Sequence, residues 1–411
     1  MDRTILHCDL NGFYASVECL FHPELKKVPM AVAGNPKNRH GIILAKNELA
    51  KGFGIKTAET VWQAKKKCPE LILVSPRRGE YSKYSKLVNG IYNRYTNLVE
   101  PFGIDESWLD ITGVYHLSGS GFEVAEEIRG TVHKELGLTI SVGVSWNKIF
   151  AKLGSDYKKP DATTIISREN YMEIAYPLPV TDLLFVGKSA ADILGKLKIR
   201  TIGDLARSDR EVITSRLGKM GSTIWGYANG LDDSPVAPAG RPRESQSIGN
   251  GMTFKRDLLG MKDIRTAIFA LSDEVAYRMR KQGVSCRVIA VTIKNTALKT
   301  ISRQRTLPGP THLSKEIAAT SIEIIKESWN LKKPIRMLSI TGSGLTDKDS
   351  ACEQITLFAD SGEKKKQERL ESAMDKIREK YGKSSLTLGS AIDDDLGTGA
   401  LDRGGSLPFS S

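Results

Sequence analysis

The sequence predicts an α+β fold built on two split β-α-β units. The order strand, helix, strand, strand, helix, strand runs over residues 4–145 once an insert at 11–74 is set aside, and it returns over 243–346. A stretch with three prolines, residues 234–242, separates the second unit from what precedes it. A chain of 411 residues has room for two to four domains of ordinary size.

The elements of the first unit follow from two periodicities in the sequence. Apolar residues that recur every three or four positions predict helices, and short runs rich in β-branched and aromatic residues predict strands. The elements expected on these grounds are a strand at 4–8, an insert with strands at 28–33, 41–44 and 71–74 and a helix at 59–68, a helix at 81–95, hairpin strands at 98–102 and 107–111, a helix at 122–136 and a strand at 139–145.

Element order predicts that three carboxylates meet at one edge of the first sheet. In a split β-α-β fold the first strand lies beside the third and antiparallel to it, so the end of one meets the start of the other. Asp9 ends the first strand, and Asp105 and Glu106 precede the third. Acids packed in this way repel one another and raise one another's pKa values unless cations separate them.

A cluster of three acids suits a nucleotidyl-transfer site. That reaction needs a deprotonated 3′-hydroxyl, in-line attack on phosphorus and a neutralised leaving group, and two divalent cations supply all three. Mg²⁺ takes oxygen ligands and keeps several waters, so we expect two Mg²⁺ ions per site, with Mn²⁺ as a substitute. Acids at hairpin turns also cap backbone groups, so these two pieces alone leave a structural interpretation open.

The remainder of the chain divides into a helical region, a linker and the second unit. Residues 168–232 are expected to form short helices, one of them capped by Thr201. Residues 234–242 contain little besides proline that packs and are expected to be a linker. In the second unit we expect a helix at 263–282 and strands at 284–294, 299–306 and 335–341, and in the Gly-, Ser- and Asp-rich end, residues 390–411, disorder.

The charge of the chain points to a polyanionic partner. The formal net charge is +12 and the sequence pI is about 9.3. No apolar run is long enough to span a membrane, and the N-terminus leads directly into a strand rather than a signal peptide, so nucleic acid is the expected partner. Residues 241–346 hold 19 Lys and Arg against 8 Asp and Glu. Their strand residues Lys294, Lys299, Arg303 and Arg305 could form one DNA-binding face, and the alternative is a solvated basic face.

The cysteines argue against a disulfide framework or a zinc site. There are five, Cys8, Cys19, Cys68, Cys286 and Cys352, widely spaced and without a C-x-x-C pair. They are expected to be small buried residues in a protein of the reducing cytoplasm.

Four motifs resemble those of the Y-family (translesion) DNA polymerases, in particular the DNA polymerase IV type. They stand in the family's order and extend over about residues 1–345. The matching segments are His7–Glu18, Gly103–Asp110, Ser141–Asp156 followed by Lys158–Pro160, and Ser247–Asn250 followed by Thr253–Phe254 and Arg256–Leu258.

The resemblance implies a right-hand polymerase with a ferredoxin-like palm. The palm would be residues 1–10 and 75–165, the small fingers 11–74, the helical, helix-hairpin-helix-like thumb 166–233, and the little finger, a second split β-α-β domain, 243–346. It also implies low-fidelity, lesion-bypass synthesis on primer-template DNA by a monomer that uses deoxynucleoside triphosphates (dNTPs).

Several site residues carry over by position. Asp9, Asp105 and Glu106 match the metal-binding acids, and the Leu10 carbonyl matches a further ligand. Tyr14 matches the aromatic steric gate that excludes ribonucleotides, with Phe13 beside it. Lys159 matches a lysine that reaches the phosphates.

The sequence departs from the family at two places. Glu48 stands where a tyrosine usually donates to the triphosphate, and Ala45 where a hydroxyl residue is common. Because an ionised carboxylate donates no hydrogen bond, weakened nucleotide binding is expected, although Lys51 can still meet a phosphate. In the thumb, Phe185 replaces the first glycine of a DNA-binding turn, and Gly187 is expected to keep its flexibility.

The tail, residues 347–411, contains a short motif that resembles the sliding-clamp peptide of bacterial polymerases. Gln354, Leu357 and Phe358 carry it, and a buried strand is the alternative. A helix of unassigned role is expected at 366–381. Two other functions compete with synthesis: a nucleotide cyclase on the same sheet, and a catalytically weak scaffold that binds DNA and the clamp.

Overall fold

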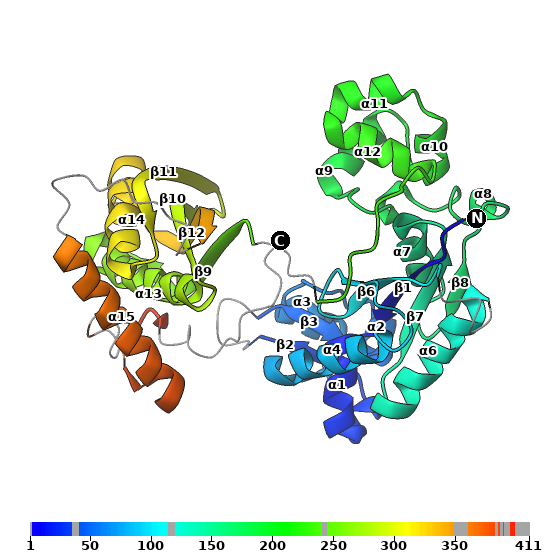
Figure 1. The fold of residues 1–411 in the computed structure, drawn as a ribbon, viewed down its shortest axis with the longest axis horizontal. Helices are drawn as coiled ribbons and strands as arrows, with labels where there is room; N and C mark the ends of the chain where they lie inside the picture. Colours follow the sequence, from blue (N-terminus) through cyan, green and yellow to red (C-terminus); the bar gives the residue numbers. More distant parts are fainter. Residues whose placement is uncertain are drawn as a thin grey trace. The chain divides into compact units, whose positions relative to one another are not determined.

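The computed structural model describes residues 2–34, 41–113, 120–240, 245–347, 361–382, 385–386, 389 and 395–398. The chain forms two compact units, the first of residues Met1–Gly34 with Ile42–Pro242 and the second from Arg243 onward. Figure 1 shows the helices and strands of both units.

A five-stranded sheet organises the first unit. Its order is β5-β6-β1-β7-β8, and every neighbouring pair is antiparallel except β7 and β8. The predicted position of the first strand beside the third is therefore confirmed, whereas β8, only three residues long, was not predicted. The strands are β1 (Ile5–Leu10), β5 (Val99–Pro101), β6 (Glu106–Asp110), β7 (Ile140–Ser145) and β8 (Thr163–Ile165).

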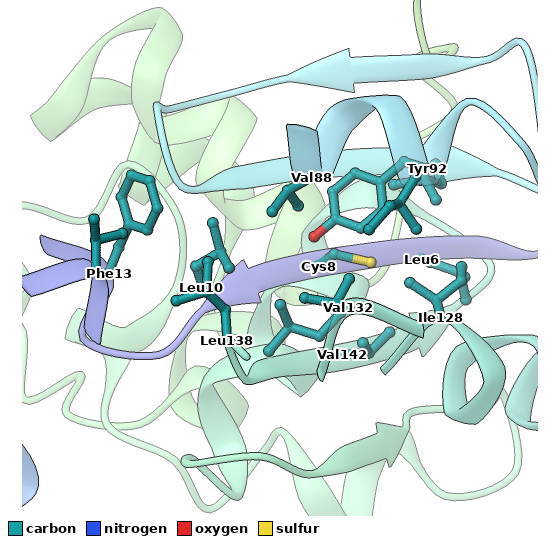
Figure 2. Packing of buried hydrophobic residues seen from close by; sticks show 14 of the residues in the cluster. Leu6, Cys8, Leu10, Phe13, Val88, Tyr92, Ile128, Val132, Leu138 and Val142 are labelled. Carbon is teal, nitrogen blue, oxygen red and sulfur yellow. The ribbon is translucent and has the colours of Figure 1, made fainter. Parts of the chain in front are cut away.

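Helices cover both faces of this sheet. On one face α4 (Arg78–Tyr92) and α6 (Gly121–Leu136) pack on the side chains of Leu6, Cys8 and Leu10, which alternate along β1 (Figure 2). The opposite face meets α7 (Lys148–Tyr157), which follows β7 and carries Ala151 against Ile5. His7 and Asp9 lie on this second face, because successive side chains of a strand point to opposite sides.

The insert after β1 forms a small domain around a three-stranded sheet of order β3-β2-β4. Asn47 joins two of its elements: its side-chain oxygen accepts from the backbone N–H of Ala50, which caps α2, and from that of Met30. The elements of the insert are α1 (Phe13–Phe21), the 3₁₀ turn Pro23–Lys27, β2 (Met30–Ala33), β3 (Ile43–Lys46), α2 (Glu48–Gly52), α3 (Val61–Lys67) and β4 (Ile72–Val74).

A cluster of short helices follows the sheet. Thr201 caps α10 as predicted, since its side chain accepts from the backbone N–H of Asp204 and the Asp204 carboxylate accepts from that of Thr201. The elements are α8 (Tyr171–Ile174), the 3₁₀ turn Val180–Asp182, α9 (Lys188–Lys196), α10 (Ile202–Arg207), α11 (Arg210–Leu217) and α12 (Lys219–Ala228).

The expectation that residues 234–242 pack little is wrong for residues 234–240, the part that the structure describes. Val236 is 3 % exposed and packs with Ile5, Trp108 and Ala151, and the backbone N–H of Ala237 donates to Glu100 at 2.9 Å. One apolar side chain among prolines is enough to fix this segment against the first sheet, and composition does not register a single residue.

The second unit repeats the element order of the first but not its sheet order. The strands are arranged β11-β10-β12-β9, so the last strand, β12, lies between the two parallel strands β9 and β10. In the first unit the strand between the two parallel strands β1 and β5 is instead the third one, β6. The elements are β9 (Ser247–Leu258), α13 (Gly260–Lys281), β10 (Val284–Asn295), β11 (Thr300–Thr311), α14 (Ser314–Ser328), β12 (Ile335–Asp347) and α15 (Ser361–Tyr381).

Buried ion pairs hold α15 within the second unit. Glu371, 3 % exposed, accepts from the Arg280 guanidinium and from the backbone N–H of Ser314 at the start of α14. Arg378 pairs with Asp273 on α13 at 2.8 Å. The helix expected at 366–381 is therefore confirmed, and it begins five residues earlier, at Ser361.

The expectation of disorder over residues 390–411 is also wrong at residues 395–398, and the rest of that range lies outside the described residues. The Leu396 side chain is 2 % exposed and belongs to the core of the second unit, and its carbonyl accepts from the backbone N–H of Lys255. Asp395 pairs with Arg256 at 2.6 Å. A single leucine inside a polar segment supplies the apolar contact that average composition hides.

Candidate active site

The register of the first sheet brings the three predicted acids together. Asp9 on β1 is the cross-strand partner of Glu106 on β6, and the backbone N–H of Leu10 donates to the Asp105 carbonyl at 2.9 Å. The juxtaposition expected from element order is therefore present. The strand pairing fixes it, because a slip of one residue would turn Asp9 to the other face.

Burial and neighbouring charges together disfavour the ionised form of Asp105. Burial, followed by the charges of Asp9 and Glu106, raises the pKa of Asp105 to about 6. Among the residues that the structure describes, Asp105 forms no ion pair, and the charge of Lys159 offsets the rise of its pKa only in part. The donor set, all carboxylate oxygen, fits the hard divalent cations.

Two lysines neutralise the other two acids. Lys152 Nζ lies 2.6 Å from Glu106 Oε2, and Lys159 Nζ lies 2.9 Å from Asp9 Oδ2. Burial opposes ionisation of Glu106, but the neighbouring His7 and Lys152 hold its pKa at about 2. Lys152 was not predicted, because its role depends on how α7 lies across the sheet.

His7 is a second residue that the sequence analysis missed. It is fully buried, with Nδ1 2.8 Å from Ser155 Oγ and Nε2 3.3 Å from Glu106 Oε2. Donor atoms of His7, Asp9 and Glu106 lie within 4.8 Å of one another, whereas Asp105 is not a member of this group. The available signal was the two-residue spacing of His7 and Asp9, which places both side chains on one face of the strand.

A cavity of about 480 Å³ lies beside the acids. Its volume suits a nucleotide-sized ligand. Tyr14 lies in its wall with its ring stacked on Tyr81 at a centroid distance of 4.1 Å, so the phenol ring is held in place. Other predicted site residues that line the cavity are Asp9, Leu10, Phe13, Lys51, Asp105 and Lys159.

The two departures in the sequence have distinct structural outcomes. Glu48 Oε2 lies 3.2 Å from Lys51 Nζ. The Lys51 ammonium, which was expected to meet a phosphate, is therefore paired with an acid. At the thumb turn, Phe185 adopts φ 68°, the left-handed conformation that favours glycine. Gly187, at the start of α9, has φ −78° and ψ 177°. The position that adopts a glycine-favouring conformation is therefore 185, and the expected role of Gly187 stays a prediction.

The expectation that four basic residues form one face of the second sheet is also wrong. Arg303 and Arg305 on β11 pair across with Val291 and Ile289, whose side chains are buried on the helix-covered face. Lys294 lies three residues from Val291 on β10, and because successive side chains of a strand alternate between faces, it points to the other face. Arg305 is further held by Glu323 at 2.5 Å and by Glu327 at 2.6 Å.

Lys299 lies outside the strands, in the turn between β10 and β11, where its backbone N–H donates to the Asn295 side chain at 2.9 Å. Residues 354–358, with the expected clamp motif at Gln354, Leu357 and Phe358, and Cys352 lie outside the described residues. The four described cysteines are buried and free, as predicted. Among the described residues, no helix is long and apolar enough to cross a membrane.

A carboxylate cluster at a sheet edge beside a nucleotide-sized cavity defines the class of a metal-dependent nucleotidyltransferase. Comparisons with known proteins narrow the class. Residues 8–156 match the impB/mucB/samB family model, and residues 245–357 match the model of that family's C-terminal domain.

Two relatives are full-length matches. The chain is 46 % identical to DNA polymerase IV of Acetivibrio thermocellus over 96 % of its own length and 98 % of the relative's. It is 37 % identical to DNA polymerase IV 1 of Bacillus subtilis over 95 % of its own length and 93 % of the relative's. A solved Y-family DNA polymerase chimera superposes with a TM-score of 0.73 at 20 % identity, covering 84 % of this chain and 99 % of that one.

The chain belongs to the Y-family of DNA polymerases, of the DNA polymerase IV type. It is accordingly a DNA-directed DNA polymerase of translesion synthesis, with the right-hand fold of its family and a requirement for divalent metal ions. These findings do not favour the scaffold or cyclase alternatives.

Proposed function

We propose that Asp9, Asp105 and Glu106 hold two Mg²⁺ ions, for which Mn²⁺ can substitute, and that this site adds dNTPs to a primer 3′ end in template order. The observation that carries the proposal is the cross-strand pairing of Asp9 with Glu106 beside Asp105, whose pKa the site raises to about 6. The Leu10 carbonyl, next to Asp9 in the cavity wall, is the proposed further ligand.

Bound divalent cations would lower the pKa of the 3′-hydroxyl and neutralise the leaving pyrophosphate. The chain's own residues prepare the site. His7 and Lys152 hold the Glu106 carboxylate ionised and oriented, and Lys159 keeps its ammonium next to Asp9 at the cavity, within reach of phosphate oxygens. Phe13, 3 % exposed, packs beside Tyr14 and supports its ring.

Tyr14 is proposed as the steric gate. Its ring stacks on Tyr81 and cannot move aside without losing that contact, so a ribose 2′-hydroxyl would collide with it. Tyr14→Ala should therefore incorporate ribonucleotides, while Tyr14→Phe, which keeps the ring, should continue to exclude them. Equal exclusion by both variants in single-nucleotide incorporation assays would remove this assignment.

The remaining assignments follow the family scheme. We propose the palm, fingers, thumb and little-finger boundaries given above, with DNA-backbone contacts from Lys294, Lys299 and Arg303 of the second unit and from the α9 turn at Gly187 of the first unit. Arg305 is the weakest of these candidates, because two glutamates already pair with it. Docking of Gln354, Leu357 and Phe358 on a sliding clamp, a monomeric state and a cytoplasmic location are also part of the proposal.

Primer extension with purified protein tests the proposal. The parent should extend a primer in template order with Mg²⁺, and Asp105→Asn should lose extension while retaining DNA binding. Asp233→Asn, a change at an exposed aspartate of the first unit, is the matched control and should extend normally. A protein that binds DNA without extending it would instead be a scaffold, and cyclic nucleotide formation without DNA would indicate a cyclase.

A further inference from the structure

Three lysines line the nucleotide cavity, and two of them are already paired. Lys159 lies 2.9 Å from Asp9 and 2.6 Å from Asp156, and Lys51 lies 3.2 Å from Glu48. Lys46, the third, forms no ion pair within the described parts of the chain. Its Nζ donates to the Thr57 hydroxyl at 3.4 Å, a weak contact that a phosphate oxygen can replace.

Lys46 stands on a rigid part of the insert. It is the last residue of β3 and pairs with Ala31 on β2, and Asn47, which follows it, is tied to Met30 and Val28 by hydrogen bonds of 3.2 and 2.8 Å. Such anchoring fixes the backbone from which the side chain extends, so the backbone loses little conformational freedom when the ammonium binds a ligand.

The backbone of Lys46 also approaches the turn that begins the catalytic motif. A Cβ atom at Gly12, where φ is 52°, would lie 3.1 Å from the Lys46 carbonyl oxygen. Gly12 immediately precedes α1, which carries Phe13 and Tyr14. Lys46 is therefore positioned beside the same segment that carries the proposed gate residue, in the wall of the same cavity.

The balance of charges in the cavity wall explains why an unpaired lysine at position 46 matters for nucleotide binding. The cavity wall contains three acids, Asp9, Glu48 and Asp105, against its three lysines. A nucleoside triphosphate brings several further negative charges, and Glu48 offsets Lys51. A lysine side chain that is not paired with an acid is the group best able to bind this ligand.

We propose that Lys46 binds the triphosphate of the incoming nucleotide and compensates for Glu48, which stands where the family usually has a hydrogen-bond donor. Glu48 in turn limits Lys51 to a secondary role. This inference rests on the proposed polymerase function and adds to it a phosphate ligand that family motifs do not identify.

Steady-state single-nucleotide incorporation on primer-template DNA tests it. Lys46→Ala should raise the KM for dNTP by about tenfold, the loss expected for one charge-assisted hydrogen bond, with little change in kcat. Lys46→Arg, which keeps a cation, should stay near the parent. Lys56→Ala removes an exposed charge of the same insert that does not line the cavity, and its KM should be unchanged.

A second variant tests the link to Glu48. Glu48→Gln should lower the KM by releasing Lys51, and Lys46→Ala should cost less in that background than in the parent. Equal thermal unfolding midpoints of all variants would exclude a folding defect as the cause. An unchanged KM for Lys46→Ala in an actively extending protein would overturn the Lys46 assignment alone, whereas absence of extension by the parent would overturn the polymerase proposal.

Discussion

Replacement of Asp105 by Asn should stabilise the metal-free protein while it abolishes synthesis. Asp105 is a carboxylate whose ionised form the folded protein disfavours, through burial and through the charges of Asp9 and Glu106. Its pKa is raised from an ordinary 3.8 to about 6. The folded state therefore binds a proton more tightly than the unfolded chain, and folding stability falls as the pH rises from about 4 to about 6.

The size of the effect follows from that difference in pKa. A shift of roughly two units corresponds to about 3 kcal/mol of stability lost above pH 6. Water at the mouth of the site screens part of this repulsion, so we expect about 1–2 kcal/mol in practice. Asn has nearly the same shape and no charge, so the variant should gain that amount at pH 7.5 and almost nothing at pH 4.

Thermal unfolding in EDTA at both pH values measures the gain, with Asp233→Asn as the control. At pH 7.5 the midpoint of Asp105→Asn should exceed that of the parent by a few degrees. Added Mg²⁺ should then raise the midpoint of the parent more than that of the variant. A variant that is less stable than the parent at pH 7.5 in EDTA would refute the claim that the metal-free site disfavours an ionised carboxylate at position 105.

Three further changes test contacts and backbone conformations that determine the stability of the two units. Glu371→Ala leaves the helix-start amide of Ser314 without its acceptor and removes one of two acids from the buried Arg280 guanidinium, which keeps Asp375, so it should cost the second unit about 1–3 kcal/mol in urea unfolding. Glu363→Ala, at an exposed pair on the same helix, should cost almost nothing. Gly143→Ala would place a Cβ 1.8 Å from a backbone carbonyl of α7 and should cost more than about 4 kcal/mol or prevent soluble expression. Gly130→Ala, at an open helical position, should instead raise the unfolding free energy by about 0.5–1 kcal/mol. Phe185→Gly should relieve the left-handed backbone and raise the unfolding free energy by about 0.5–1 kcal/mol, a gain that Phe185→Ala should not reproduce.

Sequence reasoning found the acids because topology alone fixes them. Asp9 ends one strand and Asp105–Glu106 begins its antiparallel neighbour, and no detail of side-chain packing is needed to bring them together. Resemblance to a family then supplied Tyr14 and Lys159, which no periodicity would have identified.

The residues that were missed depend on packing that the sequence does not encode locally. Lys152 and the Ser155 partner of His7 reach the acids only because α7 lies across β1 in one particular register. Val236 and Leu396 are single apolar residues in polar surroundings, and each reaches a core formed by distant elements. The sheet order of the second unit likewise differs from that of the first although the order of elements is the same.

Anomalous diffraction from crystals grown with Mn²⁺, primer-template DNA and a non-hydrolysable nucleotide tests the central claim most directly. We predict two manganese peaks whose ligands include Asp9, Asp105 and Glu106, with the nucleotide phosphates beside them. Ordered DNA and nucleotide with no manganese bound by these three side chains would contradict the account.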